Sequence, residues 1–361
     1  MAKPKGRKPA KDSKPPDPKV WKGCKAEGCT KYAPFLEEYC WKHLSDDKKT
    51  AYKRKIELWA KTEQHLERAN LQEVNLEGAD LSRSLLDKAV LRNANLKGAY
   101  LRDARLYGAL LFGCSLEGAH LERAFMWKAD LKDTNLDKAI FSGANLGQAY
   151  LSGAIWRDAY DLTWANIQEI GEEVDRDWIE AGDVYRDLKA YFKQKGQYGD
   201  ESKAYYREKL MAKHNAFWRC FYGQQPPGIF LKKSRPHTKR RSKVNTFFRW
   251  LVLWFSWAVM GFGERWWLTA FWAVGFILGF GLLYFWGTNA GWGQLLYKGN
   301  QQIKSIWDCL YFSVVTFATL GFGDISPALK SWAKLPVIGE VIMGYVFLGT
   351  LVTLIARKMG R

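Results

Sequence analysis

Four side chains near the amino terminus have the types and spacing of a metal site. They are three cysteines and one histidine in a C-x4-C-x10-C-x2-H pattern: Cys24, Cys29, Cys40 and His43. Three thiolates and one imidazole suit a tetrahedral zinc ion, and a closed shell of four ligands leaves no position for a catalytic water. Free cysteines in a reducing compartment are the alternative. We expect structural zinc in a segment covering 21–60, in which a helix follows the ligands.

A second group of residues could bind a cation through its backbone. It is the stretch T-L-G-F-G-D at 319–324, in which Gly321 and Gly323 flank Phe322. Glycine takes positive φ readily, so successive carbonyls can turn the same way, and Thr319 adds a hydroxyl beside them. The carbonyls that would form this ladder belong to Thr319, Leu320, Gly321 and Phe322. One chain cannot surround an ion in this way, but four copies around an axis can, because each ring of oxygens replaces part of the ion's water shell.

The elements that must position this stretch are apolar and of two lengths. Residues 268–286 contain no charged side chain and residues 335–356 contain only Glu340, so each run can cross a hydrocarbon core of ~30 Å. Between them, 304–317 is apolar but about half that depth as a helix. Non-helical backbone at membrane depth survives only where protein or a water path surrounds it. We therefore expect a transmembrane helix at 264–287, an extracellular turret at 288–303, a pore helix and loop at 304–327, and a second transmembrane helix with a basic tail at 335–361.

The residues before the first span are basic and aromatic. A Lys- and Arg-rich stretch, 226–246, precedes the apolar run 247–263, which is short and contains Arg249. We expect a basic juxtamembrane segment that contacts anionic lipid, followed by an interfacial helix. Two crossings keep both termini on one side, and with no leader visible we expect that side to be the cytoplasm of a cell membrane. The net charge of +18 also permits nucleic-acid binding, which we do not favour, because basic residues beside a span more often fix its cytosolic side.

A third pattern lies between these two regions. From Leu66 to Trp156 an apolar side chain recurs at every fifth position, and over most of the run a small residue precedes it by two positions. This period fits neither a helix, at about 3.6 residues, nor a strand, at about 2. It fits a solenoid in which each unit forms one side of a square coil and both residues point inward.

Units such as Ala79-Asp80-Leu81 and Ala144-Asn145-Leu146 resemble the pentapeptide-repeat family over about 66–159. The resemblance implies a right-handed quadrilateral β-helix, which we place at 61–165. Some members of the family mimic DNA with acidic faces, but acidic and basic residues nearly balance in these repeats. We expect a rigid cytosolic scaffold that binds a protein or a small ligand.

Three segments flank the repeats. Residues 1–20 are rich in lysine and proline and are expected to be a disordered basic tail. The C-W-K-H ending of the metal-ligand segment resembles small bacterial zinc knuckles. After the repeats, 166–225 has helical spacing interrupted between Gly196 and Gly199, which predicts a helical hairpin that links the repeats to the membrane part.

The carboxy-terminal part, roughly 266–356, resembles the two-span pore-loop potassium channels, whose filter reads T-V-G-Y-G-D. The resemblance implies an α-helical homotetrameric pore in which residues Thr319 to Gly323 bind potassium ions and Asp324 caps the outer mouth. The half-length helix before the filter would then be a re-entrant pore helix.

Three departures from this family affect the support of the filter. Phe322 lacks the hydroxyl of the usual tyrosine, Tyr311 and Phe312 replace a tryptophan pair, and Val315 stands where some relatives carry a glutamate. Tyr311 can still reach Asp324. We expect a less braced filter that tends to stop conducting during sustained opening.

The second span contains two glycines and one carboxylate with special roles. Gly344 and Gly349 are candidate hinges, because glycine weakens a helix, and close helix packing is the alternative reading. Glu340 is costly in lipid and must face protein or water. We expect it to brace the pore helix from behind.

These patterns favour one function over two alternatives. The favoured one is a homotetrameric potassium channel, gated or localised through its cytosolic zinc-knuckle and repeat domains. The alternatives are a membrane-anchored repeat scaffold with a vestigial pore, and a channel that selects weakly among cations. An enzyme is not expected, because the sequence contains no nucleophile-base pair, phosphate loop or open metal site.

Overall fold

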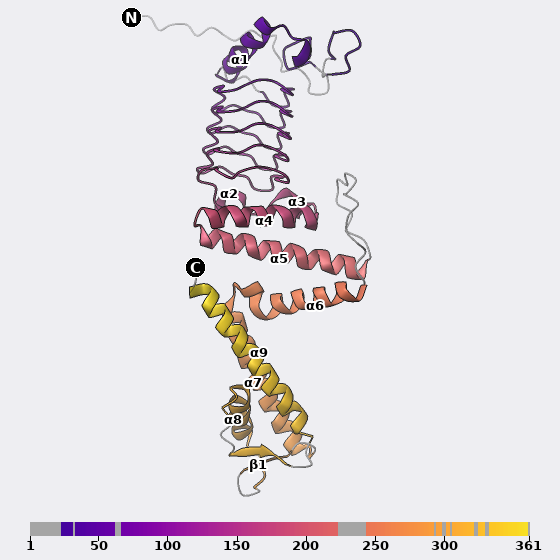
Figure 1. The fold of residues 1–361 in the computed structure, drawn as a ribbon, viewed down its shortest axis with the longest axis vertical. Helices are drawn as coiled ribbons and strands as arrows, with labels where there is room; N and C mark the ends of the chain where they lie inside the picture. Colours follow the sequence, from indigo (N-terminus) through magenta and orange to yellow (C-terminus); the bar gives the residue numbers. More distant parts are fainter. Residues whose placement is uncertain are drawn as a thin grey trace, which may run out of the picture. The chain divides into compact units, whose positions relative to one another are not determined.

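The computed structural model describes residues 23–31, 33–61, 66–222, 243–291, 294–297, 301–303, 305–320, 324–328 and 332–359. The chain divides into two units, Met1–Arg240 and Arg241–Arg361 (Figure 1). The expected tail 1–20 and most of the expected juxtamembrane segment 226–246 lie outside the described residues.

The first unit contains a four-sided β-helix and five α-helices among its described residues. Its helices are η1 (Trp41–His43), α1 (Asp46–Lys61), α2 (Trp164–Ile167), α3 (Gly171–Val174), α4 (Trp178–Gln194) and α5 (Tyr198–Phe221). The β-helix lies between α1 and α2 (Figure 1).

The five-residue period forms one side of a square coil, as the sequence predicts. Parallel bridges join Asn70 to Val90 and Val90 to Leu110, so four units complete one coil. The Leu71 N–H donates to the Val90 carbonyl at 2.8 Å, and the Val90 N–H donates to the Ala69 carbonyl at 2.9 Å. Because such bonds repeat along the run, each coil satisfies the backbone groups of the next. The domain is a right-handed quadrilateral β-helix.

Two stacks of side chains fill its interior. Leu81, Leu101 and Ala99 are typical members and have no exposed surface. The stack of small residues contains two polar side chains that keep a hydrogen bond. Cys114 donates to the carbonyl of Leu91, and Thr134 donates to that of Leu111. A buried polar group that keeps a hydrogen bond costs little stability.

Nearly every side of the coil ends in a tight turn whose third residue is left-handed. Glycine fills this position at Gly98 and Gly108, where φ is 61°. Arg83 and Lys128 adopt the same conformation at 59°, which costs a non-glycine residue about 1–2 kcal/mol. The fixed turn geometry therefore overrides local preference at the second pair.

The amino-terminal end of the β-helix is covered by α1 and the segment before it. Tyr52 and Ile56 of α1 are buried against the first coil. The Tyr52 hydroxyl donates to the Phe35 carbonyl at 2.9 Å, and the Asn70 side-chain amide donates to the Ala33 carbonyl at 2.8 Å. These bonds connect the metal-ligand segment, α1 and the first coil.

The carboxy-terminal end is covered by α2 and α3. The buried amide of Asn166 donates to the carbonyls of Phe141 and Ala144, at 3.1 and 2.7 Å. In α3, one carboxylate oxygen of Glu172 accepts from the backbone N–H groups of Leu151 and Ser152, at 2.7 and 2.8 Å, and from the Ser152 hydroxyl at 2.6 Å. These side chains form hydrogen bonds with backbone groups of the last coil, which would otherwise be left unpaired.

The expected helical hairpin is formed by α4 and α5, and it also closes the core of the β-helix. The Tyr191 hydroxyl in α4 donates to the Ala159 carbonyl at 3.0 Å. The carboxylate of Glu173 accepts from Tyr185 in α4 and pairs with Arg207 in α5. The hairpin therefore covers the carboxy-terminal end of the β-helix core, in addition to linking the repeats to the following residues.

The second unit contains two long apolar helices and a short one between them. Its elements are α6 (Lys243–Met260), η2 (Gly261–Gly263), α7 (Trp266–Asn289), β1 (Leu295–Tyr297), α8 (Ile306–Phe317), β2 (Ile325–Pro327) and α9 (Lys334–Met359). A sharp turn joins α6 to α7, where Phe262 has φ 58°. Thr269 and Trp272 of α7 donate to the carbonyls of Val259 and Ala258, and so satisfy the end of α6.

The Glu172 cap yields a stability prediction. In the full-length protein, Glu172→Ala leaves three donors without their acceptor, which costs about 1–3 kcal/mol locally. We expect faster hydrogen-deuterium exchange at Leu151 and Ser152, measured by mass spectrometry. Glu67→Ala, at an exposed turn of the first coil, is the control, and an equal change in both variants contradicts the cap.

The same carboxylate has a defined pH dependence. Burial raises the pKa of Glu172 above its usual value, although the hydrogen bonds from Ser152 and Leu151 oppose this. Because the folded pKa exceeds the unfolded one, the stabilising contribution is complete below the unfolded pKa and is lost as pH rises through the folded pKa. Protection at Leu151, corrected for the intrinsic exchange rate, therefore falls over this range, and Glu172→Gln removes the dependence.

Candidate functional site

The short helix α8 has the length and boundaries expected of a half-membrane helix. It begins after Ser305, whose hydroxyl accepts from the Trp307 N–H at 3.2 Å. Its 12 residues extend about 18 Å, roughly half of a hydrocarbon core. Cys309, Phe312 and other apolar side chains bury it against α7 and the neighbouring loops.

A buried carboxylate joins α8 to both long helices. Glu340 in α9 has no exposed surface. One of its oxygens accepts from the Tyr284 hydroxyl of α7 at 2.7 Å, and the other accepts from the Ser313 hydroxyl of α8. The Ser313 oxygen also lies 2.9 Å from the Ile277 carbonyl of α7. The carboxylate therefore lies behind α8, at the junction of three helices.

Two glycines allow the long helices to approach α8 closely. A Cβ on Gly344 would lie 2.0 Å from the carbonyl oxygen of Phe317, the last residue of α8. A Cβ on Gly281 of α7 would lie 3.2 Å from the Cα of Leu310. At Gly349, by contrast, an added Cβ would meet nothing within 4 Å. Close packing therefore explains Gly344, whereas it gives no reason for Gly349 within one chain.

The chain leaves α8 through a strained residue. Thr319 has φ 56°, a left-handed conformation that is unusual for a β-branched side chain. Its N–H donates to the Thr316 carbonyl at 3.1 Å, and the Leu320 N–H donates to the Val315 carbonyl at 3.1 Å. The next three predicted filter residues, Gly321, Phe322 and Gly323, lie outside the described residues.

The support residues named from the sequence lie around this loop. The Tyr311 hydroxyl is hydrogen-bonded to the Asp324 carboxylate, which also accepts from the Ile325 N–H at 3.1 Å. Val315 is buried. With Tyr311, Asp324 and Thr319 it lines a cavity of about 350 Å³ beside the loop.

A small sheet anchors the far side of the loop, and no sequence pattern indicated it. Strands β1 and β2 pair antiparallel, with Leu296 opposite Ser326. Ile325 is buried together with Leu295 and Tyr284. The segment Ile325–Pro327 is therefore attached to Leu295–Tyr297 rather than to α9 alone.

Sequence reasoning also missed the partners of Glu340. Tyr284 and Ser313 are polar residues within apolar helices, and that contrast was the available signal. Their separations in sequence from Glu340, 56 and 27 residues, gave no indication of the contact.

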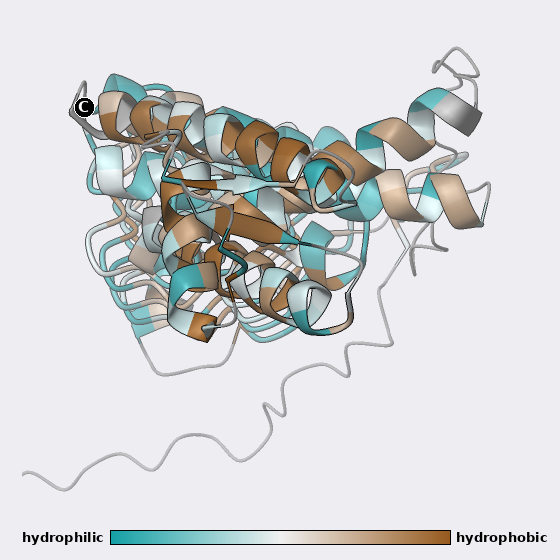
Figure 2. Cartoon of the chain, turned by 90° about the horizontal axis from the view of Figure 1, so that it is seen from below, coloured by the Kyte–Doolittle hydropathy of each residue, from teal (hydrophilic) through white to brown (hydrophobic). Residues whose placement is uncertain are grey.

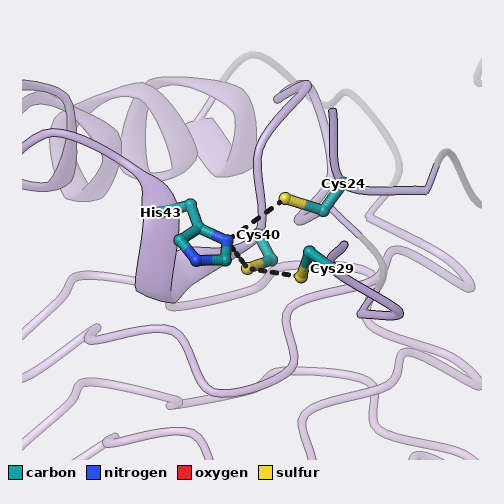
Figure 3. Close-up of side chains that lie close together, drawn as sticks. All are labelled: Cys24, Cys29, Cys40 and His43. Carbon is teal, nitrogen blue, oxygen red and sulfur yellow. Dashed lines mark hydrogen bonds between the residues drawn. The ribbon is translucent and has the colours of Figure 1, made fainter. Parts of the chain in front are cut away.

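The four predicted metal ligands come together in the first unit (Figure 3). All four ligand atoms lie within 4.8 Å of one another. Cys24 Sγ is 3.5 Å from His43 Nδ1, Cys40 Sγ is 3.3 Å from the same nitrogen, and Cys29 Sγ is 3.8 Å from Cys40 Sγ. This Cys3His cluster can hold a metal ion.

The surroundings of Cys24 favour its thiolate. Desolvation opposes this, but hydrogen bonds from the backbone at Cys40 and Ala26 and from the His43 ring lower the pKa of Cys24 to about 6. The thiolate is the form that binds metal.

Two helices of the second unit are long and apolar enough to cross a membrane. They are Trp267–Asn289 in α7 and Lys334–Ala356 in α9. In Figure 2, hydrophobic segments, drawn in brown, recur along α9, the helix that ends at the C mark. In these spans 17% and 22% of the residues are buried, so most of their apolar surface is available to lipid or to another chain.

Comparison with known proteins identifies both regions of sequence. Residues 272–361 match the family model described as an ion channel. Residues 69–108 and 114–153 match eight copies of the pentapeptide repeat.

Solved structures of three pentapeptide-repeat or resistance proteins also align. HetL, involved in heterocyst differentiation regulation in the cyanobacterium Nostoc sp. strain PCC 7120, is 43% identical over 25% of this chain and 41% of its own, with a TM-score of 0.24. Rfr23 from the cyanobacterium Cyanothece 51142 is 34% identical over 24% and 60%, with a TM-score of 0.15. QnrB1, a plasmid-mediated fluoroquinolone resistance protein, is 22% identical over 30% and 60%, with a TM-score of 0.25. The chain thus spans 41% to 60% of the length of these structures.

No curated protein matches the sequence significantly. The two family matches coincide with the β-helix and with the pair of apolar helices around α8. The chain therefore carries an ion channel domain of the two-span kind, preceded in sequence by a pentapeptide-repeat β-helix.

Proposed function

We propose that four copies of this chain form a potassium-selective channel in the cell membrane. One observation carries the proposal. The half-length helix α8 is hydrogen-bonded to Glu340 of α9 through Ser313, and it leads directly into T-L-G-F-G-D. Backbone that enters a membrane without crossing it needs protein or water around it. Fourfold symmetry provides both, because four loops then surround one axis.

Potassium selectivity is supported by the chemistry of the loop. Carbonyls of residues Thr319 to Gly323 would replace the hydration shell of a permeating ion, and the left-handed backbone at Thr319 suits such a turn. Asp324, hydrogen-bonded to Tyr311, would stand at the outer mouth. The negative end of the α8 dipole would favour a cation in the cavity below.

Both termini are proposed to be cytoplasmic. Basic residues precede α6, at Lys239, Arg240 and Arg241, and lie in the last turn of the second span, α9, at Arg357 and Lys358. Such residues favour the cytosolic side. The helix α6, with exposed aromatic side chains and the single inner charge of Arg249, suits an interfacial position.

The β-helix is proposed to be the receiving domain of the channel. It is rigid, closed at both ends, and can bind a protein or a small ligand on its sides. A signal from it would reach the pore through α6, whose end is hydrogen-bonded to α7. Neither matched family is of an enzymatic kind, and we propose no catalytic activity.

The metal of the Cys3His cluster is proposed to be structural zinc. In a tetrahedral zinc site, sulfur atoms lie ~3.8 Å apart and sulfur lies ~3.5 Å from nitrogen, given Zn–S of ~2.3 Å and Zn–N of ~2.0 Å. The separations of 3.8 Å between Cys29 and Cys40, and of 3.5 and 3.3 Å between cysteine sulfurs and His43, fit this geometry. Four protein ligands leave the ion a structural role.

Ion flux tests the channel directly. Purified protein in vesicles with a potassium gradient should conduct, with reversal potentials that favour potassium over sodium by at least ~10-fold, a difference of ~1.4 kcal/mol. Gly321→Ala should abolish conduction because it restricts the filter backbone, whereas Gly275→Ala, where a Cβ meets nothing within 4 Å, should conduct normally. A folded tetramer that passes no ion would reduce the protein to a membrane-anchored scaffold.

Removing the Glu340 carboxylate should loosen the pore. Glu340→Ala leaves the buried Tyr284 hydroxyl without its acceptor, at about 1–3 kcal/mol, and Ser313 keeps only the Ile277 carbonyl. We expect a lower tetramer melting temperature and faster loss of conduction, with Glu340→Gln closer to wild type because its amide keeps an acceptor oxygen. Thr353→Ala, at an exposed position of α9, is the control. Equal stability of Glu340→Ala and the control would count against the bracing role.

Metal removal should loosen the amino-terminal end of the β-helix alone. The purified protein should contain one zinc per chain, and Cys29→Ser or Cys40→Ser should lose it, whereas Cys220→Ser should keep it. Chelation should then raise hydrogen-deuterium exchange in 66–76, next to the cluster, and leave 146–160 unchanged. A zinc-free protein with full protection at 66–76 contradicts the structural role.

A further inference from the structure

The helix α5 continues beyond its partner α4. Trp178, the first residue of α4, stacks on His214 of α5 with ring centroids 4.9 Å apart. From there α5 runs on to Phe221 (Figure 1). Its last two turns therefore project past the start of the hairpin.

This projecting end carries an exposed aromatic strip. We define the α5 aromatic strip as Phe217, Trp218, Phe221 and Tyr222. The side chains of Phe217, Phe221 and Tyr222 are 36%, 54% and 62% exposed. Ring centroids lie 4.8 Å apart between Phe217 and Phe221 and 4.4 Å apart between Trp218 and Tyr222, so the rings form one continuous surface.

Along the sequence, the charge on either side of the strip has one sign. The sequence contains no acidic residue between Glu208 and Glu264, and eleven lysines and arginines lie in that interval. Arg219 belongs to the projecting end itself, and the partly buried Lys213 directly precedes it. The first turns of α5 differ, because they contain Asp200 and Glu201.

The sequence also limits how far this end can lie from the bilayer. Residues 223–242 connect it to Lys243, where α6 begins before the first membrane span. Twenty residues reach at most about 70 Å when fully extended. The strip therefore lies no more than about 70 Å from the start of α6. Over this distance, a connection that is not fully extended allows the strip to contact the membrane surface.

We infer that the α5 aromatic strip, with Arg219, binds the anionic surface of the bilayer that holds α7 and α9. Aromatic rings with an apolar body and a polar edge partition to the headgroup region, and basic side chains beside them bind anionic lipid. This inference rests on the membrane location in the proposed function and is independent of which ion the pore conducts. It gives the repeat domain a second, reversible attachment to the membrane.

A fluorescent label at Cys220 tests the contact in the full-length, zinc-loaded protein. Cys220 lies within the strip, Cys114 and Cys309 are buried, and the remaining cysteines form the metal cluster. Bimane on Cys220 would be measured in nanodiscs that contain nitroxide-bearing lipid, with or without phosphatidylglycerol. We expect quenching at least about twofold stronger with the anionic lipid, and loss of that difference at high salt.

Two matched variants complete the test. In Tyr198→Cys with Cys220→Ser, the label moves to an exposed site at the other end of α5, and no lipid-dependent quenching is expected. Phe221→Ser with Tyr222→Ser should reduce quenching at Cys220 to that control level, whereas Leu58→Ser, an exposed apolar site on α1, should not.

The inference is overturned by equal quenching at both label positions, or by quenching that ignores lipid charge and salt. Quenching that RNA or a soluble protein fraction abolishes while anionic lipid has no effect also overturns it. Potassium flux in the same preparation reports on the pore separately, so that failure of the proposed function and failure of this contact are distinguishable.

Discussion

Glu340 accepts hydrogen bonds from Tyr284 and from Ser313, and through these two hydroxyls one carboxylate joins α9 to α7 and α8. A carboxylate without donors would be too costly at membrane depth, so its burial requires both partners to stay in place. In turn, α8 is too short to be held by spanning the bilayer. The position of the loop after Phe317 therefore depends on this contact and on the close approach at Gly344.

The requirement that buried polar groups find hydrogen-bond partners also shapes the β-helix, because a solenoid leaves unpaired backbone groups at both ends. At one end Asn70 bonds to the segment that carries the metal ligands, and at the other Glu172 and Asn166 accept from or donate to the final coil. Side chains from flanking helices thus replace the missing coil.

The sequence predicted those features that repeat or that act through local spacing. The five-residue period fixes which groups can pair between coils, so the β-helix followed from it, and four ligands over a short interval predicted the metal cluster. The contact of Glu340 with Tyr284 joins residues far apart in sequence through tertiary packing. No local pattern specifies such a pair, and the same is true of the pairing of β1 with β2.

The two candidate hinge glycines of α9 differ in what surrounds them, and this separates their roles. At Gly344 any side chain would collide with the backbone of Phe317, so this part of α9 is fixed against α8. At Gly349 an added Cβ would meet nothing within 4 Å, and glycine there weakens the helix by about 0.5–1 kcal/mol relative to alanine. A bend at Gly349 would move the end of α9 and leave Glu340 and Gly344 in contact with α8. Movement of the basic end of α9 is thereby compatible with an undisturbed contact between α8 and α9.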